Sequence, residues 1–451
     1  MIFSAPRFVV VDDKEEHLLA IVKAFQYLGS PCLGVHYNQE SGVDPIHFRG
    51  VRCLFMDLHL INSHASSDYK SQFSSIASIL EDSISMAGGP YVLVLWTEQS
   101  HVCDELRAYL DKSIDPAKPY VRPLAVLSLA KEAFITPADG GIIDSSKLQA
   151  AVLDSITANP QLAALLGWEV DVLSAAGDTL ASLLNLIEVE QRKTENFPTA
   201  VDTILSRLAR ETVGKPNVEV NQRTAIYSAL APILTDRILN QDVPEETQAL
   251  WKKAVTRHND KDLEAASPKE AGELNRILHL AVPGSETLRP TDWGAVVTWP
   301  FDWSDEGVQQ FTGLTIKQML CEEFRLRSSA LEQCKPVLVR IGAACDYAQD
   351  NRGPISYLFG LEVPRSAERQ LDSSKNPIKL SDAIWQSPIF MTPGSQEDSV
   401  LYVHFRFPLT FLKDACVNWE VSYRLREQLL MQLITSVSGY VSRPGIVRLP
   451  A

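Results

Sequence analysis

The chain has 451 residues, of which 45% are hydrophobic and 22% are charged, and its formal net charge is -14. This length and composition predict a globular protein of roughly two to four domains. The acidic balance argues against broad nucleic-acid binding through phosphate neutralisation, and no apolar run approaches the ~20 residues that span a bilayer.

The cysteines and the amino terminus bear on the cellular compartment. The seven cysteines are scattered and odd in number, a pattern that favours reduced thiols over a disulfide framework or a zinc site. The chain begins with a strand-like run and shows no signal-peptide pattern. We therefore expect a cytoplasmic protein that is not held in a membrane.

Short apolar runs alternate with helix-like segments over residues 1–142. The runs with strand character are RFVVVDD, PCLGVHY, CLFMD, YVLVLW and PLAVLSL. Between them, KEEHLLAIVKAFQYLG, SQFSSIASILEDSISMAG and QSHVCDELRAYLDK repeat apolar residues at helical spacing. This alternation predicts βα units around a five-stranded parallel sheet, in an α/β domain of flavodoxin-like fold.

The middle of the chain, residues 145–282, is almost wholly helical in pattern. Its segments repeat apolar residues every three or four positions, and Pro160, Pro198 and Pro216 mark the breaks. We predict a helical bundle or linker domain here. The Leu- and Ala-rich segment 161–188 leaves two interpretations open, a homodimer interface and a buried bundle core, of which the buried core is favoured.

Residues 285–451 change in composition and predict a mainly β, α+β domain. The runs PVLVRIGAACDYA, ISYLFGLEVP and SVLYVHFRF have strand character, and SYRLREQLLMQLITSVSGYV predicts a closing helix. In SVLYVHFRF, strict alternation predicts that Tyr402, His404 and Arg406 face solvent. The same domain has a tryptophan cluster, for which packing is favoured over a binding platform: Trp293, Trp299 and Trp303.

Polar side chains follow four of the five predicted parallel strands. Asp12 and Asp13 end the first run, Asp57 the third, Thr97 the fourth and Lys131 the fifth. Because the carboxyl ends of parallel strands line one crevice, these groups are expected to converge. Carboxylates, a hydroxyl and an amine are the groups needed to hold a divalent cation and accept a phosphoryl group.

This order of residues resembles the receiver domain of two-component response regulators. The resemblance implies that Asp57 is the phosphoacceptor. It also implies that Asp12, Asp13 and Asp57 hold Mg²⁺ together with the backbone carbonyl of His59. The separation of Asp13 from Asp57 is usual for the first strands of that family.

The resemblance gives roles to the two later positions and also has departures. Thr97 is expected to donate a hydrogen bond to the phosphoryl group, and Lys131 to place a positive charge beside it. The family usually has a small residue where Glu98 stands, a proline where Glu132 stands, and in many members an aromatic where Ser128 stands. We therefore expect a receiver that accepts phosphate without the standard aromatic switch.

The resemblance also suggests a biological setting. Large receivers with unfamiliar carboxyl-terminal domains occur in bacterial defence operons built like two-component systems, and this chain resembles them. A histidine kinase is then the expected partner. A second expected partner is a protein in which a receiver is fused to an effector. In such an anti-phage system this chain would act as a phosphate sink or as a partner-binding regulator.

Two alternatives remain open at this stage. One is a receiver-gated enzyme that uses Cys345 as a nucleophile, with His404 as its base. The favoured interpretation of Cys345 is instead a buried cysteine at the end of a strand, with Asp346 capping a turn. The other is a pseudo-receiver scaffold that is never phosphorylated.

Overall fold

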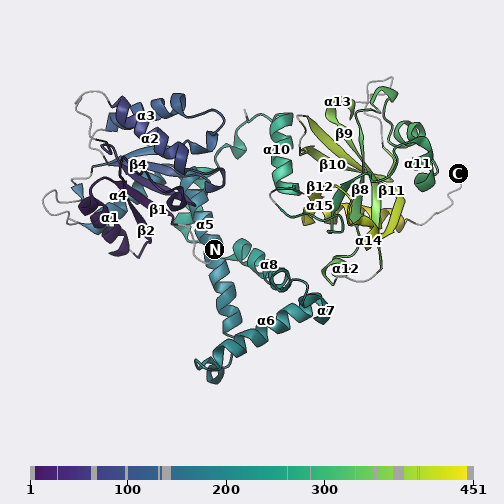
Figure 1. The fold of residues 1–451 in the computed structure, drawn as a ribbon, viewed down its shortest axis with the longest axis horizontal. Coiled ribbons are helices and arrows are strands. Elements are labelled where there is room, and N and C mark those ends of the chain that lie inside the picture. The colour runs from purple at the N-terminus through teal and green to yellow at the C-terminus, as the bar shows by residue number, and fades with distance from the viewer. Residues whose placement is uncertain are drawn as a thin grey trace. The chain divides into compact units, whose positions relative to one another are not determined.

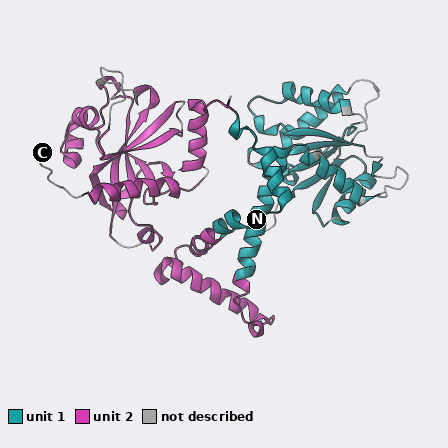
Figure 2. Cartoon of the chain, turned by 180° about the vertical axis from the view of Figure 1, so that it is seen from behind, with its two compact units in different colours: residues 1–182, 234–260 teal, residues 183–233, 261–451 magenta. Residues whose placement is uncertain are grey.

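The fold is that of a computed structural model, shown in Figure 1. It describes residues 6–27, 29–61, 69–96, 100–130, 133–134, 144–261, 263–284, 286–330, 332–349, 353–368, 380–393, 395 and 397–443. Contacts divide the chain into two compact units, coloured separately in Figure 2. The first comprises residues 1–182 and 234–260, and the second residues 183–233 and 261–451. The three-domain division expected from the sequence stays a prediction.

The first unit is built on a five-stranded sheet whose neighbouring strands are all parallel. The strands lie in the order β2-β1-β3-β4-β5, which is the flavodoxin-like order. Their bounds are β1 (Phe8–Asp12), β2 (Cys32–His36), β3 (Cys53–Asp57), β4 (Val92–Trp96) and β5 (Ala125–Leu129). The predicted α/β fold class is therefore confirmed.

Helices cover both faces of this sheet. They are α1 (Glu15–Tyr27), α2 (Lys70–Ser83), α3 (Ser100–Ser113), α4 (Ser145–Thr157) and α5 (Pro160–Leu184). In β3, Leu54 packs with Phe73 of α2, while Phe55 packs on the opposite face with Ile21 of α1 and Leu148 of α4. Successive strand residues point to opposite faces, so only a continuous apolar run such as CLFM can bury both.

Within the described residues, three 3₁₀ turns lie in the connections between the strands of this sheet. A single 3₁₀ turn, η1 (Pro45–Phe48), lies between β2 and β3. The helix predicted to reach Gly88 ends five residues earlier, at Ser83, and is followed by a separate 3₁₀ turn, η2 (Met86–Gly88). A third 3₁₀ turn, η3 (Pro119–Val121), precedes β5.

The middle of the chain is helical, as predicted. After α5 come η5 (Val189–Arg192), α6 (Phe197–Val213), α7 (Lys215–Val218), α8 (Gln222–Asn240), α9 (Glu245–Ala254), η6 (Arg257–Asn259) and α10 (Pro268–His279). Pro160, Pro198 and Pro216 each stand in the first turn of a helix, where a missing N–H is tolerated. Across the described residues, no helix combines the length and apolarity that a membrane crossing requires.

The second unit has a seven-stranded sheet in the order β10-β11-β9-β8-β7-β12-β6, in which all pairings are antiparallel. The strands are β6 (Leu280–Ala281), β7 (Ala295–Thr298), β8 (Lys335–Ile341), β9 (Pro354–Pro364), β10 (Ile384–Met391), β11 (Asp398–Leu412) and β12 (Val421–Leu425). Its added helices are α11 (Asp305–Thr312), the π-helix η7 (Gln318–Glu323), η8 (Ser328–Ala330), α12 (Ala344–Ala348), α13 (Arg365–Glu368), α14 (Lys413–Cys416) and α15 (Glu427–Val441). The predicted mainly β domain is confirmed.

The prediction of a solvent-facing side for β11 is wrong. Tyr402 and His404 are 5% and 0% exposed, and only Arg406 reaches solvent. β11 lies between β9 and β10, and the rings of Phe324 and Phe407 pack on His404 at 5.6 and 4.5 Å. Aromatic and imidazole rings are therefore buried on the face that the alternation marked as polar.

Two boundaries also differ from the sequence prediction. The segment SYRL, expected to open the closing helix, belongs to the strand β12, and α15 begins only at Glu427. The segment ACDYA, expected to continue a strand, is the short helix α12.

An ion cluster fixes α5 to the amino-terminal end of the first sheet. Arg52, just before β3, donates from Nε to the two carboxylate oxygens of Glu169 at 3.1 and 2.9 Å, and from Nη2 at 2.6 Å. Arg7, just before β1, lies 2.9 Å from the same carboxylate. The hydrogen bonds from Arg52, against a smaller opposing effect of burial, hold the pKa of Glu169 below its ordinary value.

We expect Glu169→Gln to destabilise the first unit by about 1–3 kcal/mol at neutral pH, because both arginines lose a charged partner. A carboxyl whose pKa is lowered by folding contributes stability above its unfolded pKa of about 4.3, and this is lost as the pH falls through the folded pKa. The difference between wild type and variant should therefore shrink below about pH 4. Hydrogen exchange of α5 peptides, at neutral pH and below about pH 4, measures this difference in stability.

The matched control for this ion cluster is Glu190→Gln, because the Glu190–Lys193 ion pair lies on the surface and 84% of the Glu190 side chain is exposed. A surface pair of that kind should change stability little at any pH. If Glu169→Gln lowered the stability of the first unit equally at neutral and acid pH, the ion cluster would not be the cause of the loss.

Candidate metal centre

The candidate site lies where β1 and β3 end. The two strands are parallel neighbours, with Val11 opposite Met56 in register. Asp12 is the last residue of β1 and Asp57 the last residue of β3. Each apolar run is buried in the sheet, so each strand delivers its terminal carboxylate to the same edge.

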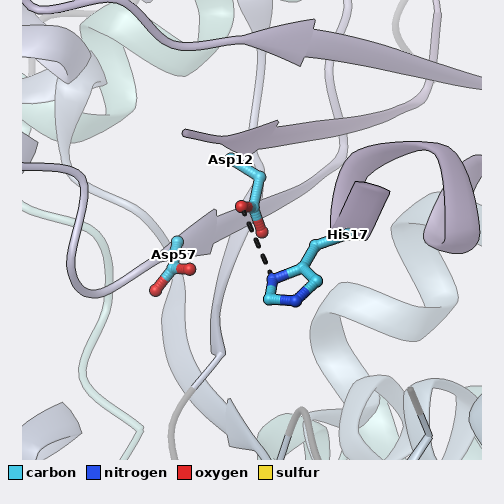
Figure 3. Close-up of side chains that lie close together, drawn as sticks. All are labelled: Asp12, His17 and Asp57. Atoms are coloured by element: carbon cyan, nitrogen blue, oxygen red, sulfur yellow. Dashed lines mark ion pairs between the residues drawn. The ribbon is translucent and has the colours of Figure 1, made fainter. Parts of the chain in front are cut away.

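Asp12, His17 and Asp57 gather at this edge (Figure 3). Each offers one ligand atom, and the three atoms all lie within 4.8 Å of one another. Asp12 is fully buried and Asp57 is 8% exposed. The His17 ring comes from the first turn of α1, and its Nδ1 lies 4.0 Å from Oδ1 of Asp12, the dashed line in Figure 3.

Backbone amides orient both carboxylates. The amide of Lys14 donates to Oδ1 of Asp12 at 2.9 Å, and the amide of His59 donates to Oδ1 of Asp57 at 3.0 Å. Such donors offset part of the cost of burying a carboxylate. Nδ1 of His17 is buried and makes no hydrogen bond within the described part of the chain.

This buried group can bind a metal ion. It offers two carboxylate oxygens and one imidazole nitrogen, which divalent cations accept as ligands. Two buried carboxylates so close together also repel each other, and a bound cation would offset that repulsion. The residues present therefore fit a divalent cation.

The residues expected from the sequence are placed as follows. Asp12 and Asp57 come together. The carboxylate of Asp13 is not among the three gathered ligands, and its backbone carbonyl accepts a hydrogen bond from Nε2 of His36 at 3.0 Å. His59 directs its amide to Asp57, as described above.

Thr97 and Lys131, with the neighbouring Glu98 and Glu132, lie outside the described residues. Their expected contacts with a phosphoryl group therefore stay predictions.

Sequence reasoning missed His17. The signal for it is its position just inside the helix that follows Asp12, because the first turn of such a helix stands above the end of its strand. The apolar periodicity of that segment pointed to core residues of α1 and gave no reason to select a histidine.

The second candidate of the sequence analysis, Cys345, is exposed in α12 and is not a buried strand-end cysteine. Its Sγ lies 4.0 Å from Oδ1 of Asp346. His404 instead contacts Glu323, with Nε2 at 3.0 Å from Oε2, and Arg406 forms an ion pair with the other oxygen of Glu323. Burial lowers the pKa of His404, although the bond to Glu323 opposes this.

Comparison with known proteins gives no relative for either unit: no protein-family model matches the chain, and no curated protein or solved structure matches it significantly. The five-stranded parallel sheet and the buried acidic pair at its carboxyl edge are compatible with a receiver fold.

Proposed function

We propose that this chain is a phosphate-accepting signalling protein that receives a phosphoryl group on Asp57 from a histidine kinase, with Mg²⁺ as cofactor. The observation that carries the proposal is the meeting of Asp12 and Asp57 at the ends of neighbouring parallel strands. One carboxylate can then hold the cation while the other both contacts it and reacts.

The proposed transfer uses few protein groups. A carboxylate oxygen of Asp57 attacks the phosphorus of a phosphohistidine, the P–N bond breaks, and the departing imidazole takes up a proton. The amide of His59 holds the carboxylate of Asp57 in a fixed orientation for this attack. When bound, Mg²⁺ would offset the negative charges of the carboxylates and the phosphoryl oxygens.

We further propose that the phosphoryl group is stored or diverted rather than used to drive the standard receiver switch. Ser128 lies in β5 at the position where many receivers carry the aromatic of that switch, and it is only half-buried. A phosphate sink within a defensive two-component system, beside a kinase and a second receiver with an effector, is consistent with this feature.

The test is phosphorylation with acetyl phosphate and Mg²⁺, followed by borohydride trapping and peptide mass spectrometry. We expect one adduct on Asp57 in the wild type and none in Asp57→Asn. Asp12→Asn should reduce the yield about tenfold or more, because loss of even an outer-shell partner of a metal ligand typically lowers metal affinity or activity by such a factor. Asp82→Asn, which alters an exposed carboxylate of α2, is the control and should behave as wild type.

An adduct on another residue in the wild type, or an unmodified protein at saturating donor and Mg²⁺, would contradict the proposal. Equal labelling of wild type and Asp12→Asn would show that phosphorylation of Asp57 does not depend on Asp12. The proposal would then lose the observation that carries it.

A further inference from the structure

Residues of the second unit line a pocket of about 530 Å³. Four neighbouring strands contribute to its lining: Thr298 from β7, Lys335 from β8, Glu362 from β9 and Ser422 from β12. A cavity of this volume is the size that binding sites for small organic molecules have. The residues of the candidate metal centre belong to the other unit, so the pocket is separate from the proposed function.

Glu362 is the unusual residue of this pocket. It is 5% exposed, and its Oε1 has no hydrogen-bond partner among the residues that the structure describes. Burial raises the pKa of Glu362, while a weak hydrogen-bonding interaction with the Tyr423 phenol and the positive charge of Lys335 lower it. The fully buried phenol of Tyr423 is a neutral donor beside Glu362, but its oxygen likewise makes no hydrogen bond of normal geometry to a described residue.

A buried carboxylate oxygen without a donor is unfavourable by about 1–3 kcal/mol or more. Folded proteins satisfy nearly all such groups, so a buried carboxylate that lines a cavity and has only a poorly placed phenol beside it points to a ligand that supplies a better donor. In the sheet, Glu362 stands opposite Lys335 of β8 and Leu401 of β11. Lys335 is exposed, and its positive charge acts on Glu362 without an ion pair within 4.0 Å between these two described residues.

The remaining walls combine hydroxyls with apolar surface. The hydroxyls of Thr298 and Ser422 lie 3.2 Å apart on adjacent strands. Trp303 and Val337 supply apolar wall, and the Trp303 ring lies parallel to that of Phe359 behind it, 6.3 Å away. An occupant therefore meets an aromatic face and a pair of hydroxyls as well as the buried carboxylate.

We propose that this pocket binds a small molecule with an ammonium or guanidinium group on an apolar body. The cationic group gives the Glu362 carboxylate charged N–H donors, in a charge-assisted hydrogen bond that the neutral phenol of Tyr423 cannot match. Trp303 contacts the apolar body, and the hydroxyls of Thr298 and Ser422 help to orient it. A neutral molecule of the same shape leaves the carboxylate without a charged partner and binds more weakly.

Isothermal titration calorimetry of the full chain tests this with three amines, tryptamine, phenethylamine and agmatine, and with tryptophol as the neutral counterpart of tryptamine. We expect at least one amine to bind with a Kd below about 1 mM, and tryptophol to bind at least about 10-fold more weakly than tryptamine. Glu362→Gln should weaken amine binding about 10- to 100-fold, the range for a hydrogen bond to a charged group, and leave tryptophol binding unchanged.

Glu332→Gln is the matched control, because Glu332 lines the same pocket but is exposed. It should alter amine affinity by less than about 3-fold, as expected for a hydrated surface charge. If Glu362→Gln does not fold, Glu362→Asp withdraws the carboxylate from the amine and should weaken binding by a similar factor. Failure of all three amines to bind, equal binding of tryptamine and tryptophol, or unchanged affinity in the folded Glu362 variant would overturn the proposal.

Discussion

A divalent cation is expected to stabilise the first unit of the wild-type protein and to give no such gain to Asp57→Asn. An ion that binds only the folded site adds about 1.4 kcal/mol at ten times its Kd and about 2.7 kcal/mol at one hundred times. Without metal, the order of stability of the two proteins should reverse. Asp57→Asn should then be more stable than wild type by about 1–3 kcal/mol, because one of two neighbouring buried carboxylates has lost its charge.

Hydrogen exchange of the β3 and β4 peptides reports the opening of this unit by itself. The protein is measured in EDTA and at increasing Mg²⁺, with Asp82→Asn as the surface control. A wild type that gains no protection from Mg²⁺ or Mn²⁺, or an Asp57→Asn variant that gains as much as wild type, would rule out this metal centre.

His17 adds a distinction between metals to the same experiment. Imidazole nitrogen is a good ligand for transition metals, whereas Mg²⁺ prefers oxygen. His17→Ala should therefore remove part of the gain given by Mn²⁺ and leave the gain given by Mg²⁺ nearly unchanged. Loss of both gains to the same extent would indicate that His17 acts through the structure of α1.

The first sheet was predictable from the sequence because each of its strands is specified by a short, continuous apolar segment. Runs such as CLFM in β3 are apolar on both faces, and a carboxylate at the end of such a run has to leave the sheet at its edge. Parallel order then places Asp12 and Asp57 together without knowledge of any other contact. The candidate metal site was predictable to that extent.

The rest depends on contacts between distant residues. His17 becomes part of the site only because α1 packs back on the sheet, and its own segment has the pattern of an ordinary amphipathic helix. His404 has a hydrogen-bond partner in its buried position because η7 brings Glu323 to it from 81 positions away in the sequence. Alternation along β11 alone therefore assigned that face to solvent.

The aromatic core of the second unit gives the other large expected effect. Trp299 is 6% exposed, and four aromatic rings surround it at centroid distances of 5.3 to 6.0 Å: Phe301, Trp303, Phe311 and Phe359. Its Nε1 also donates to the carbonyl of Asp302 at 3.3 Å. We expect Trp299→Ala to destabilise the second unit by about 3–5 kcal/mol, since the side chain leaves a cavity and four ring contacts are lost.

Two substitutions separate packing from the mere loss of a tryptophan. Trp299→Phe keeps one ring in place and should cost about 1–2 kcal/mol, because less volume is removed. Trp168→Ala removes a tryptophan that is 52% exposed in α5 and should leave the exchange of β8 and β9 peptides unchanged. Because the Trp299 ring also packs against Trp303, Trp299→Ala should weaken amine binding in the neighbouring pocket. A variant that keeps wild-type protection of β8 and β9 would show that this cluster is not what holds the second sheet together.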